Sequence, residues 1–392
     1  MAYHTTPYLL LFLPAALLFY QITPAKWRSY TLLIFSYLFF WSFSEKLIIY
    51  LIGTTFLTHH ICIWMDTMDK RDKRKKRVFQ LGILLLLGTI LCLKYRNFFF
   101  GNVSKMAMVL HIDWSYQDQL IFLPIGISFY TLSAIGYMAD VYWGKVKAEY
   151  SLVKTALFLG FFPVIVEGPI CRWEDVEDTL FKNESVKAEN VFKGCYRIIW
   201  GLFKKMIIAD RLAVLVDKVY VGYESYSGAV IVAAAISYTI QLYMEFSGCM
   251  DMVIGSAGLF GIRLPENFSQ PFFAKTCTDF WKRWHITLGV WFKNYIFYPV
   301  SISKTARKWN KFTRKHFKGD FGKYMARMGI AAMALFPVWI SNGLWHGPKW
   351  NYIFYGLYYF GLIFMGLALE PIRDRILAVL HINPECIFYK AF

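Results

Sequence analysis

The stretch Met328-Gly-Ile-Ala-Ala-Met-Ala-Leu-Phe-Pro-Val-Trp-Ile-Ser-Asn-Gly-Leu-Trp-His346-Gly347 decides the fold, because it places a histidine at the end of an uncharged run of membrane length. A helix of about 20 apolar residues spans a bilayer. An ionisable ring at the margin of such a run is costly unless it has a partner or a task. His346 is therefore the first candidate for a functional side chain.

The composition of the whole chain points to the same class of protein. Hydrophobic residues make up 57% of the 392 residues and charged residues only 18%, which is more apolar than a soluble domain can bury. The apolar runs recur along the chain without a long polar linker. We therefore expect an all-α polytopic membrane protein with one membrane domain over residues 1–392.

Apolar runs long enough to span a bilayer, some of them with interfacial flanks, give the first set of expected helices. They are Thr5–Ala25, Ser29–Ser44, Leu47–Met65, Val78–Leu93, Leu120–Ala139, Ser225–Met244, Met328–Trp345 and Trp350–Leu369. Thr5–Ala25 has no basic segment before it and is expected to be a retained first helix.

Other segments mix apolar and charged residues, which is typical of interfacial, re-entrant or cavity-lining segments. They are Thr155–Val166, Cys195–Val221 and Phe280–Val300. The chain is thus predicted to make about nine to eleven passes or half-passes. The Pro- and Gly-containing stretches 123–130 and 265–271 predict broken or kinked elements.

The net charge of +17 is concentrated in short loops between apolar runs, chiefly Lys70–Arg77 and Lys304–Lys323. The positive-inside rule places both loops in the cytoplasm, so membrane lipids and not nucleic acid are the expected partners. The simpler interpretation of the second loop is a solvated segment near anionic headgroups. Docking of a carrier protein or acyl donor is the alternative.

The residues around His346 favour reactivity. Gly343 and Gly347 leave room for a substrate or a second backbone, and Trp345 and Trp350 make a rigid wall. The ordinary pKa of histidine, about 6.5, lets it take a proton from a hydroxyl near neutral pH. From these residues alone, a hydrogen-bonded core or interfacial histidine is the favoured interpretation and a catalytic histidine is the alternative.

A second histidine, His285, follows Asp279-Phe-Trp-Lys-Arg-Trp, so that Trp281 and His285 share a helix face. Polar side chains in the apolar second half are expected to face one another or a cavity. For each acid taken singly, a structural ion pair with a nearby Lys or Arg is the favoured interpretation. The candidate substrate-binding residues are Asn342, Trp345, Trp281, Trp284, Glu245, Asn267 and Arg283.

Other kinds of site lack their sequence patterns. The seven cysteines form no CxxC pair, and no HExxH or Cys/His zinc motif, GxSxG elbow, GxGxxG or P-loop is present. We therefore expect no metal, no disulfide scaffold and no permanently bound cofactor. A lone base in such a chain most simply activates a substrate hydroxyl against an already activated acyl group.

Ordered motifs across the chain resemble the membrane-bound O-acyltransferase family, above all its alginate O-acetyltransferase branch. They are Leu123-Pro-Ile-Gly-Ile-Ser-Phe-Tyr130 to Asp140-Val-Tyr142, Phe161-Phe-Pro163, Gly168-Pro-Ile170, Gly201-Leu-Phe-Lys-Lys205, Tyr238-Thr-Ile-Gln-Leu-Tyr243, Glu245-Phe-Ser-Gly248, Pro265-Glu-Asn-Phe268, Phe280-Trp-Lys-Arg-Trp-His-Ile286 and Gly343-Leu-Trp-His-Gly347.

The resemblance implies a ring of helices around a central tunnel in the bacterial plasma membrane, with peripheral helices in residues 1–120 and a catalytic core in 121–370. It implies that His346 is catalytic and that His285, the second candidate catalytic residue, also lies in the reaction chamber. His346 would then act as a general base while Asn342 or a Trp N–H holds the oxyanion. The co-substrate would be a cytoplasmic thioester, either acetyl-CoA or an acyl-carrier protein.

The expected function is transfer of an acyl group, acetyl first, onto a hydroxyl of an extracellular polysaccharide or onto a partner acyltransferase. The chain departs from the alginate branch at Glu245-Phe-Ser-Gly-Cys-Met-Asp251, where that branch has Asp-Phe-Ser-Gly-Tyr-Ser-Asp, and only 46 residues follow His346. In length it resembles the D-alanyl transfer protein of teichoic acid synthesis, so D-alanyl transfer from a carrier protein is an alternative. A proton-coupled transporter with histidine relays is the alternative from another class.

Overall fold

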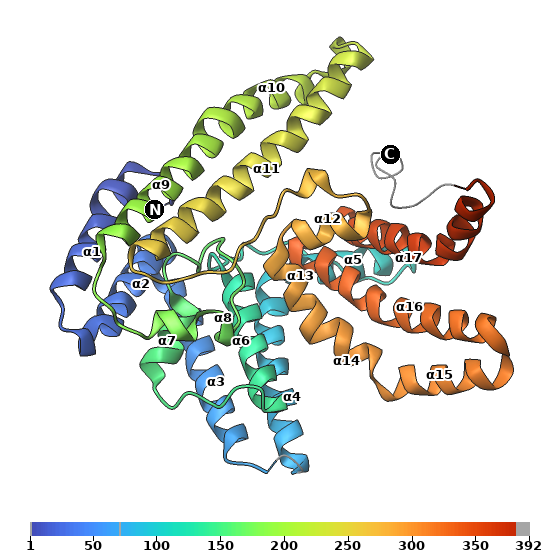
Figure 1. Ribbon diagram of the computed structural model, residues 1–392, viewed down its shortest axis with the longest axis horizontal. Coiled ribbons are helices and arrows are strands. Elements are labelled where there is room, and N and C mark those ends of the chain that lie inside the picture. The colour runs from blue at the N-terminus through green and yellow to red at the C-terminus, as the bar shows by residue number, and fades with distance from the viewer. Residues whose placement is uncertain (1, 70–71, 382–392) are drawn as a thin grey trace. The chain divides into compact units, whose positions relative to one another are not determined.

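The computed structural model describes residues 2–69 and 72–381, and it is built from helices (Figure 1). Within these ranges the strand-like pairing is an isolated bridge between Phe268 and Trp284. The all-α prediction is confirmed. Lys70 and Arg71 of the predicted basic loop, and Cys386, lie outside the described residues.

Five helical stretches of the described chain are long and apolar enough to cross a membrane, which confirms a multi-pass membrane protein. They are Ala25–Asp66, Lys73–Val109, Gly228–Leu259, Gly319–His346 and Trp350–Val379, and Pro7–Ile22 is a shorter apolar helix. The nine to eleven passes and the central tunnel stay predictions.

The chain divides into two compact units, each made of two separate stretches of sequence. Unit 1 comprises Met1–Leu87 and Leu123–Asn267, and unit 2 comprises Gly88–Phe122 and Phe268–Phe392.

Unit 1 contains α1 to α3, most of α4, and α6 to α11. Their bounds are α1 Leu13–Ile22, α2 Arg28–Ser44, α3 Ile48–Asp66, α4 Lys73–Ile90, α6 Ile127–Trp143, α7 Leu152–Gly160, α8 Trp173–Leu180, α9 Ala188–Leu202, α10 Asp210–Val221 and α11 Gly228–Leu259, with π-helical segments η1 Pro7–Phe12 and η5 Phe203–Ala209. Part of its core is a buried aromatic cluster: Tyr8, Phe39 and Phe162 contact one another, and the Tyr8 hydroxyl donates to Ser256 Oγ at 3.0 Å.

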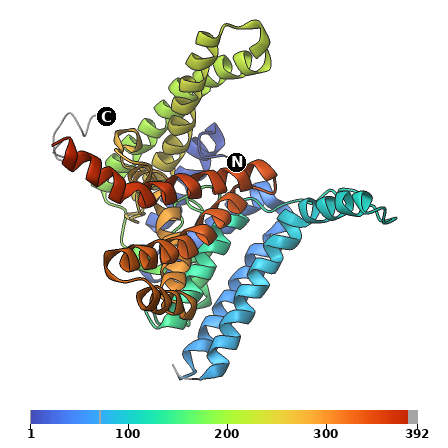
Figure 2. The same ribbon diagram turned by 90° about the vertical axis from the view of Figure 1, so that its right-hand side faces the viewer.

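Glycines bring α9 and α11 into close contact, and the two helices run side by side in Figure 1 and again from the side in Figure 2. A Cβ on Gly201 would lie 2.5 Å from the Gly248 carbonyl oxygen, and one on Gly255 would lie 2.8 Å from the Gly194 oxygen. Each helix places its two glycines seven residues apart, on one face. Backbone packs directly on backbone at both points.

Helix α11 continues to Leu259, fifteen residues beyond the predicted end at Met244. The predicted span ended at Met244 because acidic residues follow it, but in the structure these acids form ion pairs with Lys and Arg. Glu245 accepts from Lys205 Nζ at 2.9 Å, and Asp251 accepts from Lys204 Nζ at 2.6 Å and from Arg197 Nε at 3.1 Å. Pairing removes most of the cost of a charge within an apolar helix.

The break expected at 123–130 is present. Gly126 has φ +77°, and a Cβ there would lie 1.8 Å from the Ile165 carbonyl oxygen, so this position needs glycine for both reasons. Helix α6 therefore begins at Ile127, not near Leu120 where the apolar run begins.

Unit 2 contains the α5 stretch and the C-terminal helices. The bounds are η4 Leu91–Tyr95, α5 Arg96–Val109, α12 Cys277–Arg283, α13 Ile286–Phe292, η8 Lys293–Phe297, α14 Tyr298–Ser301, α15 Lys304–His316, α16 Gly319–His346 and α17 Trp350–Val379. The Trp309 indole of α15 packs where Gly329 of α16 leaves space and donates to the Met325 carbonyl at 3.1 Å. The corner between α16 and α17 carries the site described next.

Candidate active site

His346 is the last residue of α16, and its side chain is exposed. Its ring meets that of Tyr355 edge-on at a centroid distance of 5.4 Å and stacks near that of Tyr352 at 6.0 Å. Trp345 lies edge-on to it at 5.0 Å. Aromatic rings thus fix the orientation of an imidazole that solvent or a ligand can reach.

The glycines beside His346 serve close packing of α17. A Cβ on Gly343 would lie 2.3 Å from the Tyr352 carbonyl oxygen, and one on Gly356 would lie 2.3 Å from the Trp339 oxygen. A Cβ on Gly347 would lie 2.6 Å from the Tyr352 ring. Gly343 was expected to leave room for a substrate or for a second backbone. In the structure it leaves room for the backbone of α17.

His285 lies at the break between α12 and α13, with a left-handed backbone at φ +48°. This conformation is uncommon outside glycine and costs on the order of 1–3 kcal/mol. The side chain is only 4% exposed, and its ring meets that of Trp345 at 5.5 Å. Trp345 thus contacts both imidazoles, one buried and one exposed.

The predicted aromatic residues divide into two groups. Trp281 packs against Trp339 at 5.1 Å and Tyr359 at 4.9 Å, and it also meets Tyr355, which contacts His346. Trp284 instead packs on Phe268 at 5.1 Å and stacks on Phe280 at 5.6 Å. Trp281 therefore belongs to the aromatic wall of the histidine site.

Arg283 and Asn342 differ in how their polar atoms are satisfied. The Arg283 guanidinium pairs with Asp279 at 3.1 Å and holds the pKa of that carboxyl below its usual range. Asn342 is 6% exposed, and its Oδ1 has no hydrogen-bond partner among the described residues. It lies four residues before His346 on the same helix face. A ligand that donates a hydrogen bond next to His346 would satisfy this buried oxygen of Asn342.

Two residues that the sequence reasoning missed hold the end of α16. Lys94 Nζ donates to the Trp345 carbonyl at 2.6 Å, and the Tyr95 hydroxyl donates to the Leu344 carbonyl. The last carbonyls of a helix have no partner within it, so these donors satisfy groups that would otherwise be orphaned. A lysine directly after the apolar run Val78–Leu93 was the available signal, but nothing in the sequence links it to Trp345.

Glu245 and Asn267 belong to unit 1, whereas the other predicted site residues belong to unit 2. Glu245 pairs with Lys205, which is the interpretation that was favoured for each acid taken singly. The Asn267 amide nitrogen donates to Met250 Sδ at 3.2 Å. Across the described residues, no three His, Cys, Asp or Glu side chains are grouped to hold a metal ion.

The class defined by these observations is an all-α membrane protein with two histidines on either side of a tryptophan at the end of a span. Residues 145–314, which include His285, match the family model "MBOAT, membrane-bound O-acyltransferase family". The chain is 31% identical over 359 residues to the probable alginate O-acetylase of Pseudomonas putida, covering 92% of this chain and 69% of that protein. It belongs to the membrane-bound O-acyltransferase family and is an O-acyltransferase.

Two other relatives differ in the acceptor and acyl group that they are named for. The peptidoglycan O-acetyltransferase of Helicobacter pylori is 28% identical over 392 residues, covering 91% of this chain and 68% of that protein. The teichoic acid D-alanyltransferase of Bacillus subtilis is 29% identical over 241 residues, covering 60% and 56%. The chain spans 64% to 69% of the length of the alginate relatives. The relatives are acyltransferases, which sets the transporter alternative aside.

Proposed function

We propose that this chain transfers an acetyl group from a cytoplasmic thioester, acetyl-CoA or an acyl-carrier protein, to a hydroxyl of an extracellular polysaccharide or of a partner acyltransferase. The observation that carries the proposal is the exposed His346 ring, held by aromatic neighbours beside the buried acceptor of Asn342. The alginate and peptidoglycan relatives support acetyl as the cargo and a polysaccharide as the acceptor.

In this mechanism His346 takes the proton of the acceptor hydroxyl as its oxygen attacks the thioester carbonyl carbon. The tetrahedral intermediate collapses with cleavage of the C–S bond, and the thiolate leaves with the proton that His346 returns. Imidazole suits this role because its ordinary pKa lies near neutral. The Asn342 Oδ1 orients the substrate by accepting from another of its donors, because the one proton of the reacting hydroxyl goes to His346. Trp345 and Tyr355 restrict the rotation of His346.

The test is transfer of labelled acetyl to surface polymers by membranes that contain the full chain. His346→Ala should lower the rate by about 100-fold or more, since general-base catalysis contributes that much. His60→Ala is the matched control, because His60 is exposed on α3 and its hydrogen bond within the described residues is to the Phe56 carbonyl of its own helix. Equal rates in wild type and His346→Ala would exclude the general-base role.

D-alanyl transfer to teichoic acid is the second candidate, supported by the match to the Bacillus subtilis enzyme. The same assay with a D-alanyl carrier protein separates the two. Label that reaches the polymer from this donor and not from acetyl donors would replace acetyl as the cargo and leave the role of His346 intact.

A further inference from the structure

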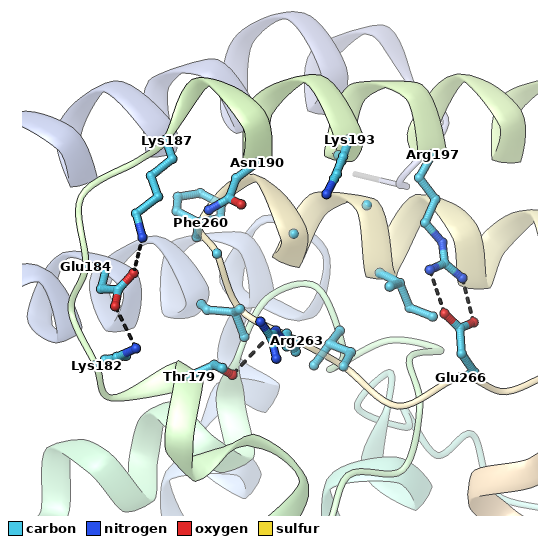
Figure 3. A pocket seen from close by; sticks show the side chains of 17 residues that line it. Thr179, Lys182, Glu184, Lys187, Asn190, Lys193, Arg197, Phe260, Arg263 and Glu266 are labelled. Carbon is cyan, nitrogen blue, oxygen red and sulfur yellow. Dashed lines mark hydrogen bonds and ion pairs between the residues drawn. The ribbon is translucent and has the colours of Figure 1, made fainter.

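A cavity of about 460 Å³ lies within unit 1, where α9 passes the C-terminal end of α11. Its walls are one face of α9, the last turns of α11, the loop 260–266 and the segment 179–187 (Figure 3). None of these residues takes part in the histidine site, so the cavity is independent of the proposed function.

The face of α9 and the end of α11 shape this cavity. Asn190, Lys193 and Arg197 follow one another at helical spacing, and Figure 3 shows their side chains extending from α9 toward the loop that carries Arg263. Helix α11 ends in a left-handed turn at Gly261, φ +75°, with Ile262 N–H donating back to the Ala257 carbonyl at 3.1 Å. This turn brings the loop 260–266 up against α9.

Cations outnumber acids in the cavity lining. The cations are Lys182, Lys187, Lys193, Arg197 and Arg263, and the acids are Glu184 and Glu266. One carboxylate, Glu184, is shared by Lys182 at 2.7 Å and Lys187 at 2.9 Å, and these ammonium groups lower its pKa to about 2. The lining residues themselves therefore carry excess positive charge, and two acids outside the lining, Glu189 and Asp251, pair with Lys193 and Arg197.

Two of these cations are available for a ligand. The Arg263 side chain has no ion-pair or hydrogen-bond partner within the described chain, since only its backbone N–H is bonded, to Thr179 Oγ1 at 3.1 Å. Lys193 pairs with Glu189, a contact in which both side chains are 72% exposed. An exposed ion pair of this kind contributes little to stability, so Lys193 can readily exchange Glu189 for another anion.

The position of the cavity indicates the ligand. Gly228–Leu259 is a candidate membrane span, and the cavity is lined by its last residues and by those directly after it. A helix of 32 residues is about 48 Å long and exceeds the hydrocarbon core of about 30 Å, so the end of α11 lies at or just beyond the lipid headgroups. Arginine and lysine are the side chains that bind phosphate groups there.

We propose that this cavity binds the phosphate group of an anionic ligand, with Lys193 and Arg263 as its principal donors and a phospholipid headgroup as the expected source. The Arg197 guanidinium, held bidentately by Glu266 at 2.6 Å, forms the fixed side of the site. The α9–α11 glycine contact keeps that side in place.

The experiment is native mass spectrometry of the purified full chain in detergent. Three ligands are compared: phosphatidylglycerol, diacylglycerol with the same acyl chains, and inorganic phosphate. Phosphatidylglycerol should be retained and diacylglycerol should not. The double variant Lys193→Gln/Arg263→Gln should bind phosphatidylglycerol about tenfold more weakly. Lys218→Gln, which removes an exposed charge on α10 away from the cavity, should bind like the wild type.

A charge-conserving variant separates loss of the site from loss of the fold. Lys193→Arg/Arg263→Lys should retain phosphatidylglycerol. Equal binding by inorganic phosphate would support the phosphate site and assign it to a soluble ligand. Equal affinity of the double Gln variant and the wild type for phosphatidylglycerol would overturn the proposal, and so would equal retention of diacylglycerol.

Discussion

At the scale of single residues, the arrangement around Trp345 distinguishes the two histidines. His285 is buried behind the indole in a strained backbone conformation, whereas His346 is exposed in front of it. Only the exposed ring can meet an incoming hydroxyl directly. His285 is suited to supporting the indole, and the reaction chamber inferred from the family resemblance stays a prediction for it.

Asn342 offers a test in which stability and activity should move apart. Asn342→Leu keeps the shape of the side chain and removes a buried acceptor without a partner, so the free energy of unfolding should stay unchanged or rise by up to about 1–3 kcal/mol. Acetyl transfer should fall at least about tenfold, because a hydrogen bond to the substrate is lost. The midpoint of thermal unfolding and the transfer rate, measured on the same preparation, check both. A fall in both together would assign Asn342 a structural role.

At the scale of elements, the end of α16 depends on η4. Lys94 and Tyr95 bond the Trp345 and Leu344 carbonyls, directly before the histidine. They touch no reacting atom in this arrangement and are positioning residues. Their contribution should therefore be visible in how well His346 is held and not in how tightly substrate binds.

The double variant Lys94→Met/Tyr95→Phe should lower kcat about tenfold or more, because small displacements of a catalytic group are costly, and should change KM less than about twofold. Lys94→Arg with Tyr95 intact should restore most of the rate. Lys105→Met, an exposed change on α5, serves as the control. An increase in KM at unchanged kcat would show that these residues bind substrate instead.

The glycine contact between α9 and α11 predicts a loss of stability from one methyl group. Gly201→Ala would place its Cβ 2.5 Å from the Gly248 carbonyl oxygen, so the free energy of unfolding should fall by about 1–3 kcal/mol. Gly258→Ala, also on this helix pair, meets nothing within 4 Å and should be neutral or slightly stabilising. Thermal unfolding in detergent measures both. Equal midpoints of thermal unfolding for the two variants would mean that the close contact of α9 with α11 does not contribute to stability.

At the scale of the whole molecule, hydropathy was enough to predict an all-α membrane protein and the span that ends at His346. Hydropathy predicted the wrong end for α11, because charged residues there pair with partners that are distant in the sequence. Asp251 of α11 is paired with Arg197 and Lys204. Hydropathy failed again at Leu120, because steric crowding against Ile165 sets the start of α6. The partnership of Lys94 with Trp345 joins residues 251 positions apart, and no local pattern encodes it.

The orientation of the chain in the membrane is a prediction at this scale. Helix α15 presents exposed Lys and Arg side chains and contains no acid, so it should lie on the cytoplasmic side. Lys315→Cys, in a background with the seven native cysteines replaced by serine, should react with a membrane-impermeant maleimide only after the cells are permeabilised. Labelling of intact cells would reverse the assigned orientation.

The bond between Lys94 and Trp345 also bears on the order of events during synthesis. At about 5–20 residues per second, a ribosome needs roughly 10 to 50 seconds to add the 251 residues that separate the two partners. Unit 2 cannot close around its first stretch until α16 has been synthesised and inserted. The end of α16 that carries His346 therefore stays without its η4 partners during that interval.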